Sequence, residues 1–208
     1  ENEAGRAAAA KRTNPKTTYA SYREMFEKEK LDLVAICPRW IDQHRDMIVY
    51  GLTATLYNES VIDQFAEAAQ DLEIMANVHL KIDTGMHRVG VRPERAVAVA
   101  QKIASNNWLT LDGVFTHCAT ADVTDSSFAD RQISIFGQTE AAIREAGLAI
   151  PQLHVANSAI AIRKLDTDLQ CTMSRIGIAM YGYSPLGNDE NLKPVMKVRA
   201  KLVLVKEM

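Results

Sequence analysis

The chain has 208 residues, with 24 basic and 26 acidic side chains, so its net charge is −2. Hydrophobic residues make up 47% and charged residues 24%, which is typical of a globular domain and excludes a disordered chain. The balanced charge excludes a nucleic-acid partner, which would require a clustered basic excess. No stretch approaches the roughly 18 consecutive apolar residues of a membrane span, so no membrane partner is expected. Because a complete (β/α)8 barrel needs about 250 residues, the length excludes a full barrel followed by a second domain.

The three cysteines, Cys37, Cys118 and Cys171, are odd in number and widely spaced, which indicates a reducing compartment without a disulfide framework. They form no CxxC pair and no zinc-like cluster with histidine, so no metal site is expected. The polar start Glu1-Asn2-Glu3 lacks the cationic residues and apolar run of a signal peptide. We therefore expect a cytoplasmic protein, and a first residue other than Met indicates a fragment or a processed chain.

The first part of the chain has short elements with recognisable boundaries. Ser21 is a helix cap because Glu24 follows three residues later, and Asn58 is placed to cap a second helix. A short apolar run before Pro38 is typical of a buried strand. The spacing predicts, in order, a helix over 21–30, a strand over 31–37, a helix over 41–50, a strand over 52–56 and a helix from Asn58 to about 69.

From residue 78 onward, strands and helices alternate regularly. The pattern predicts strands over 78–83, 111–117, 152–156 and 176–181, with helices over 93–105 and 127–146 and a short helix opened by Asn157 and Ser158. Such alternation indicates parallel βαβ units, whose functional sites lie at the carboxyl ends of the strands. The stretch 195–205 alternates with a period of two, which predicts a half-solvated antiparallel strand of another domain.

Several residues at these strand ends have either a structural or a chemical interpretation. Lys81 lies in an apolar strand, where a lysine shifts its pKa, pairs or is modified. Arg175 lies among apolar residues, where an unpaired guanidinium is costly, so it must be paired or bind a ligand. Asn157-Ser158 at a helix start is an ordinary cap or an anion site. His117 and His154, each taken alone, are more often satisfied polar residues than catalysts.

Four motifs together resemble one enzyme family. They are KIDTGMHRVG at 81–90, GVFTHCATAD at 113–122, HVANS at 154–158 and RIGIAMYGYSP at 175–185. In this order and spacing they resemble alanine racemase, the pyridoxal 5'-phosphate (PLP) enzyme that interconverts L-alanine and D-alanine for peptidoglycan synthesis. The resemblance covers about residues 50–208 and implies an α/β fold: an incomplete TIM (β/α)8 barrel at 49–190, followed at 191–208 by the first strand of a truncated C-terminal β domain.

The resemblance also implies which residues hold the cofactor. Ser158, Gly177 and Ile178 would bind the phosphate through a hydroxyl and main-chain N–H groups. Arg175 would face the pyridine nitrogen, where a permanently charged donor disfavours protonation of the ring. His154 would support Arg175 from behind.

Four further positions match the family around the same cofactor. Arg88 would lie near the phenolic oxygen, and Lys81 matches the carbamylated lysine that orients it. Carbamylation converts a buried cation into an anion that pairs with Arg88. His117 and Asn157 match polar positions around the site.

Both catalytic bases of the family are missing from this sequence. No Lys-Ala-Asn-Ala-Tyr-Gly-His-Gly-like segment with the Schiff-base lysine occurs, and the tyrosine base belongs to the C-terminal β domain. Racemisation needs one base on each face of the Cα–H bond, so we expect the chain to be inactive and to bind PLP at best non-covalently. The complete family is a homodimer. A non-catalytic PLP-homeostasis barrel is the alternative function: the length favours it, but the segment 86–88 and the final alternating strand favour a racemase.

Residues 17–48 resemble a different family, the Rossmann segment of the Gfo/Idh/MocA oxidoreductases. The matching stretches are 18–25, 31–38 and His44. The GxGxxG turn of a dinucleotide site is absent, so a function as an NAD-dependent oxidoreductase is disfavoured. Residues 1–48 are therefore an α/β segment of uncertain origin, either Rossmann-like in a chimera or a replacement barrel unit whose strand precedes 52–56.

Overall fold

A computed structural model describes residues 19, 21–28, 43–163, 169–187 and 191–195. The chain divides into two compact units, residues 1–43 and 44–208. In the first unit the described element is the helix α2, Tyr22–Lys28. The Glu24 amide donates a hydrogen bond to Ser21 Oγ over 3.2 Å, which confirms the predicted cap. The predicted strand over 31–37 lies outside the described residues.

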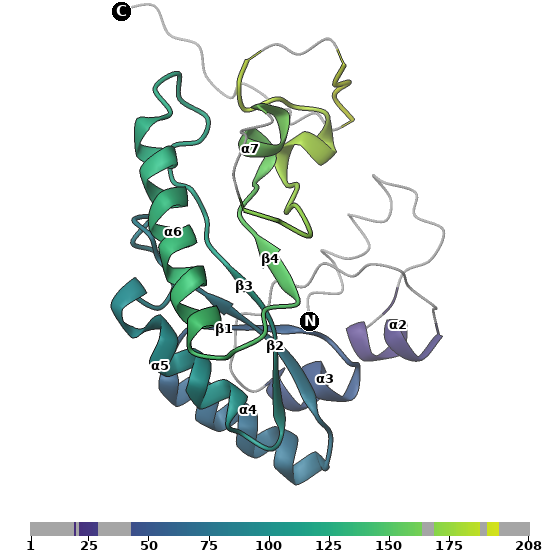
Figure 1. The fold of residues 1–208 in the computed structure, drawn as a ribbon. Coiled ribbons are helices and arrows are strands. Elements are labelled where there is room, and N and C mark those ends of the chain that lie inside the picture. Colours follow the sequence, from purple (N-terminus) through teal and green to yellow (C-terminus); the bar gives the residue numbers. More distant parts are fainter. Residues whose placement is uncertain (1–18, 20, 29–42, 164–168, 188–190, 196–208) are drawn as a thin grey trace, which may run out of the picture. The chain divides into compact units, whose positions relative to one another are not determined.

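The second unit is built from parallel strands joined by helices (Figure 1). Its elements are α3 (His44–Val49), β1 (Ala54–Leu56), α4 (Glu59–Leu72), β2 (Ala76–Lys81), α5 (Pro93–Ala104), β3 (Leu109–Phe115), α6 (Ser127–Glu145), β4 (Gln152–His154), α7 (Ser158–Arg163) and the 3-10 helix η2 (Ile178–Tyr181). The sheet order is β1-β2-β3-β4, and each neighbouring pair is parallel, as the alternation predicts. None of the described helices is long and apolar enough to cross a membrane.

Local signals in the sequence set the helix boundaries. The Asn58 side chain accepts a hydrogen bond from the Ser60 amide over 2.9 Å, so it caps α4 as predicted. Pro93 starts α5, because a first-turn residue needs no N–H donor. Gly147 follows α6 with a φ of +82°, a left-handed conformation that glycine adopts without steric cost. The predicted helices over 93–105 and 127–146 are confirmed within one residue at their ends.

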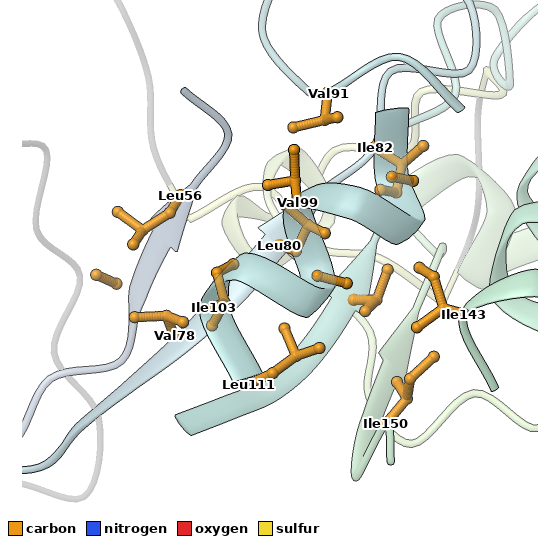
Figure 2. Packing of buried hydrophobic residues seen from close by; sticks show 14 of the residues in the cluster. Leu56, Val78, Leu80, Ile82, Val91, Val99, Ile103, Leu111, Ile143 and Ile150 are labelled. Carbon is orange, nitrogen blue, oxygen red and sulfur yellow. The ribbon is translucent and has the colours of Figure 1, made fainter. Parts of the chain in front are cut away.

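The sheet has one apolar face and one polar face. Val78 and Leu80 of β2 are fully buried and belong to the same apolar cluster as Val99 and Ile103 of α5 (Figure 2). Because side chains alternate along a strand, the intervening residues of β2 lie on the opposite face. The pairing register carries this face across the sheet, where Lys81 lies opposite Phe115 and Phe115 opposite His154. The apolar face forms the core, whereas the polar face carries predicted site residues such as Lys81 and His154.

The strand predicted over 176–181 is wrong. The segment is the 3-10 helix Ile178–Tyr181, and its Met180 amide donates to the Gly177 carbonyl oxygen over 3.0 Å. The amides of Gly177 and Ala179 donate to the Ser158 hydroxyl instead of to a neighbouring strand. A short apolar run predicts burial of its side chains, but Ile178 and Tyr181 are 48% and 43% exposed.

The remaining strand ends are shifted rather than misplaced. The strands predicted over 78–83, 111–117 and 152–156 are found at 76–81, 109–115 and 152–154. The stretch predicted as a strand over 195–205 lies outside the described residues except for Val195. The domain boundaries after residues 48 and 190 stay predictions.

Two phenylalanines on α6 provide a matched test of this packing. Phe136 is fully buried, whereas Phe128 on the same helix is 40% exposed. We expect Phe136→Ala to lower the free energy of unfolding by about 3 to 5 kcal/mol, because it removes a buried ring and leaves a cavity. Phe128→Ala should cost about 1 kcal/mol or less. Urea unfolding followed by circular dichroism measures both, and equal costs would contradict the assignment of the core face of α6.

Candidate functional site

A cavity of about 320 Å³ lies at the carboxyl ends of β3 and β4. Its walls come from the segments that follow β2, β3 and β4 and from the stretch around η2. It brings together six of the residues that the sequence predicts for the site: His117, Asn157, Ser158, Arg175, Gly177 and Ile178. Lys81, Arg88 and His154 are not part of its lining. The cavity therefore collects residues from all four sequence motifs at one edge of the sheet.

Ser158 connects α7 to the loop before η2. Its side chain is buried, and its Oγ accepts hydrogen bonds from the amides of Gly177 over 3.0 Å and Ala179 over 3.3 Å. Ile178 lies between these two residues in the chain and borders the cavity. Since the Oγ acts as acceptor in both bonds, the hydroxyl hydrogen remains available to donate. The arrangement presents a hydroxyl donor and a tightly held stretch of backbone to the cavity.

The Arg175 guanidinium lies in a ring of acceptors. Its Nη2 donates to the carbonyl oxygens of Thr116 over 2.6 Å and Val155 over 3.1 Å, and its Nη1 is 2.6 Å from His154 Nδ1. The guanidinium carbon lies 4.7 Å from the centre of the Phe115 ring. Burial lowers the pKa of Arg175 to about 10, so the group stays charged at neutral pH. None of the ion pairs among the described residues involves it.

The two predicted histidines are both held in the neutral form. Burial, together with the nearby charge of Arg175, lowers the pKa of His154 to about 3 and that of His117 to about 4. His154 is 3% exposed and stacks on Phe115 with the ring centres 4.5 Å apart. His117 Nδ1 is 3.5 Å from Arg175 Nη2. Neutral imidazoles beside a cation offer unprotonated nitrogen atoms as acceptors.

Asn157 has a structural role that the sequence left open. Its Oδ1 accepts a hydrogen bond from the Ile160 amide over 3.1 Å, which caps α7. Its Nδ2 donates to the Cys118 carbonyl oxygen over 3.4 Å and so ties the segment after β4 to the segment after β3. The residue borders the cavity and orders two of its walls.

Lys81 and Arg88 lie near the cavity without lining it. Lys81 is 4% exposed at the end of β2, and burial lowers the pKa of its ammonium group, helped by the charge of Arg88. Within the described parts of the chain, no carboxylate forms an ion pair with Lys81. Arg88 is exposed on the loop that follows β2. The pairing of Arg88 with a carbamylated Lys81 stays a prediction.

A profile of the alanine racemase N-terminal domain matches residues 7–185. The chain belongs to the alanine racemase family. An alanine racemase from Desulfovibrio desulfuricans is 36% identical over 162 residues, which is 76% of this chain and 43% of that protein. One from Treponema denticola is 34% identical over 199 residues, 91% of this chain and 52% of that protein. The chain thus spans about half the length of the curated relatives it matches.

Solved structures of the family agree with the fold. The alanine racemase of Clostridium difficile 630, solved in complex with cycloserine, superposes with a TM-score of 0.65 at 32% identity, covering 76% of this chain and 42% of that one. This likeness confirms the predicted fold class, part of a PLP-binding (β/α)8 barrel. The family match begins at residue 7 and so includes the segment 17–48. The chimeric origin of that segment stays a prediction.

Two residues of the polar face, His79 and Asp112, are not among the site residues that the sequence predicts. His79 Nδ1 lies 3.0 Å from His154 Nε2, and His79 Nε2 lies 3.3 Å from Asp112 Oδ2. The period of two along a strand could have identified His79, because it lies two residues before Lys81 on the same face. No pattern in the sequence indicates Asp112, since its place depends on the pairing of β2 with β3.

The loop after β2 is organised by one carboxylate. Asp83 Oδ1 accepts hydrogen bonds from the amides of Gly85, Met86 and His87 over 3.1, 2.9 and 3.0 Å. Burial acts to raise the pKa of Asp83, but these hydrogen bonds and the nearby His87 bring the pKa below its usual value. Gly90 approaches so closely that a Cβ there would lie 2.7 Å from the Asp83 nitrogen. The loop that carries Arg88 is therefore held by backbone contacts.

The lowered pKa of Asp83 gives a pH-dependent contribution to stability. A carboxylate with a depressed folded pKa stabilises the protein above its unfolded pKa of about 4, and this stabilisation is lost as the pH falls. Asp83→Asn should lower the free energy of unfolding by about 1 to 2 kcal/mol at pH 7. The difference from the native chain should shrink between pH 5 and pH 3.5.

Urea unfolding at three pH values measures this difference. Asp63→Asn is the control, because Asp63 is an exposed carboxylate that pairs with Lys102 over 2.8 Å and accepts no cluster of backbone amides. The free energies of unfolding of the native chain and of Asp83→Asn are compared at each pH. If their difference stayed constant from pH 7 to pH 3.5, the charge of Asp83 would not be the cause of the stabilisation.

Proposed function

We propose that the chain forms the phosphate and pyridine half of the PLP site of an enzyme that interconverts L-alanine and D-alanine. The observation that carries this proposal is the position of the Ser158 hydroxyl and the Gly177 backbone beside the Arg175 guanidinium on one cavity. PLP carries an anionic phosphate and a heteroaromatic nitrogen, so it requires donors at both ends. A cavity with donors at both ends fits that requirement.

The phosphate end fits Ser158 and the loop at Gly177 and Ile178. The Ser158 hydroxyl hydrogen is free to point at an anion, because the Oγ lone pairs already accept two amides. A Cβ at Gly177 would meet no atom within 4 Å, so the space beside this backbone is open. We infer that the Ser158 hydroxyl and the nearby main-chain N–H groups would hold the phosphate.

The pyridine end fits Arg175. A guanidinium donates and never accepts, and it keeps its charge at neutral pH. When bound, PLP supplies an electron sink for charge that develops on the α-carbon of an amino acid. Arg175 would donate to the ring nitrogen and keep that nitrogen unprotonated. An unprotonated ring withdraws less electron density from the α-carbon. His154 would hold Arg175 in place through its Nδ1, and His117 and Asn157 would border the site.

The phenolic oxygen of the cofactor is assigned to Arg88, with Lys81 in the carbamylated form. The buried ammonium of Lys81 supports this assignment, because a buried cation that forms no ion pair with a described carboxylate is costly. Carbamylation replaces the cation by an anion that attracts Arg88 and would turn it from the surface toward the site.

Proton transfer needs two bases that the 208 residues do not provide in their family context. Proton removal on one face of the α-carbon and delivery on the other would come from a lysine and from a tyrosine of a second subunit. We propose that this chain, assayed as such, binds PLP without racemising alanine. A cytoplasmic location, a role in peptidoglycan synthesis and a homodimeric complete enzyme belong to the same proposal.

The phosphate assignment is tested by titrating the full chain with PLP and recording its absorbance. Ser158→Ala should weaken PLP binding about tenfold or more, because a hydrogen bond to a charged group contributes about 1.5 to 3 kcal/mol. Pyridoxal, which has no phosphate, should bind the native chain and the variant equally. Ser105→Ala is the control, since the Ser105 hydroxyl lies at the exposed end of α5 and donates to the Lys102 carbonyl oxygen. Failure of the native chain to bind PLP would sink the proposal.

Turnover is tested separately. With saturating PLP, the 208-residue chain should convert L-alanine to D-alanine no faster than free PLP does, because both catalytic bases are missing. Chiral chromatography of the reaction mixture measures the product. Appreciable formation of D-alanine would overturn the assignment of the bases.

A further inference from the structure

The guanidinium of Arg175 is the first member of a line of polar groups on the polar face of the sheet. Its Nη1 lies 2.6 Å from His154 Nδ1, and His154 Nε2 lies 3.0 Å from His79 Nδ1. The line ends where His79 Nε2 lies 3.3 Å from Asp112 Oδ2. Three strand segments are thus connected by side chains from the edge of the cavity to a half-buried carboxylate.

The direction of every hydrogen bond in this line follows from its two ends. A guanidinium only donates, so His154 Nδ1 accepts and the proton of the neutral His154 ring lies on Nε2. That Nε2–H then donates to His79 Nδ1, which leaves the His79 proton on Nε2. The last donor meets the Asp112 carboxylate, which only accepts. Reversal of the His154 ring would place a donor against the Arg175 guanidinium, and reversal of the His79 ring would place its Nδ1–H against the Nε2–H of His154.

We propose that His79 and Asp112 are positioning residues that keep His154 in its Nε2–H tautomer and so hold the Arg175 guanidinium toward the cavity. This inference rests on the proposed function, in which Arg175 faces the pyridine nitrogen. Neither His79 nor Asp112 lines the cavity, so both act through His154. The role parallels that of the aspartate in a serine-protease triad, which fixes the tautomer of its histidine.

An irregularity in the pairing of β2 with β3 brings Asp112 to His79. The pairing of β2 with β3 shifts between Val78 and His79, so that Val78 lies opposite Leu111 and His79 opposite Gly113. Asp112 is the extra residue of this irregularity, and such an irregularity redirects a side chain. Asp112 and His79 consequently border the same hollow of the polar face.

Gly113 leaves the room that the His79 ring occupies. A Cβ at Gly113 would lie 2.8 Å from both Nε2 and Cδ2 of His79, a distance that real side chains do not adopt. The φ of Gly113 is not in the left-handed region, so backbone conformation does not demand glycine at this position. The close approach of the imidazole does.

The tautomers are measured directly by long-range 1H–15N NMR of the 15N-labelled full chain. In the native chain, His154 and His79 should each show a protonated Nε2 and an unprotonated Nδ1 at pH 7. In Asp112→Leu the His79 Nε2–H loses its acceptor, so His79 should populate both tautomers and the single tautomer of His154 should weaken. Asp63→Asn, which removes a carboxylate far from the line, should leave both ring signals unchanged.

Substitutions of His79 connect the tautomer to ligand binding. His79→Phe removes the acceptor for His154 Nε2–H, and we expect the affinity for PLP to fall about tenfold. His79→Gln places a side-chain oxygen near the lost acceptor and should restore the His154 tautomer and bring the affinity to within about threefold of the native value. If His79 had a purely structural role, the His154 ring signal would be the same in His79→Phe and His79→Gln.

The outcomes separate the inference from the function on which it rests. A protonated His154 Nδ1 in the native chain, or unchanged tautomers in Asp112→Leu, would overturn the inference even when PLP binds. Absence of PLP binding with the expected tautomers would overturn the proposed function and leave the line of hydrogen bonds established.

Discussion

The half-buried cation of Arg175 is the constraint on which the site depends. A guanidinium partly removed from water must find acceptors for its donors, and here they are carbonyl oxygens and an imidazole nitrogen. Two of those carbonyls belong to Thr116 and Val155, just beyond the ends of β3 and β4. The Arg175 amide also donates to the Ala156 carbonyl oxygen over 2.8 Å. One residue therefore joins two strand ends to the segment that carries η2.

This arrangement is possible because the sheet separates its two faces. Val78, Leu80 and Val114 are fully buried in the apolar cluster beneath the helices. The alternating positions carry His79, Lys81 and His154 to the other face. Burial of the apolar face supplies the stability of the unit, and the polar face then holds charged and titratable groups that would be costly within the core.

The sequence predicted most of this frame because the signals are local. The Asn58 cap, Pro93 at the start of α5 and Gly147 after α6 act within one turn of the chain. The strand predicted over 176–181 failed because its apolar residues resemble a buried strand, whereas its amides are taken by Ser158, about 20 residues earlier in the chain. No local pattern reports a hydrogen bond of that range.

For the candidate site, too, some features follow from the sequence and others only from the tertiary structure. Four motifs in the printed sequence determined the family, and they predicted the cofactor class and the residues that would hold it, because the motifs keep their order and spacing. Only the tertiary structure decided that Ser158, Gly177 and Arg175 share one cavity and that Asp112 lies against His79. The physical reason is that strand register, including the shift beside His79, is set by pairing between strands more than 30 residues apart in the chain.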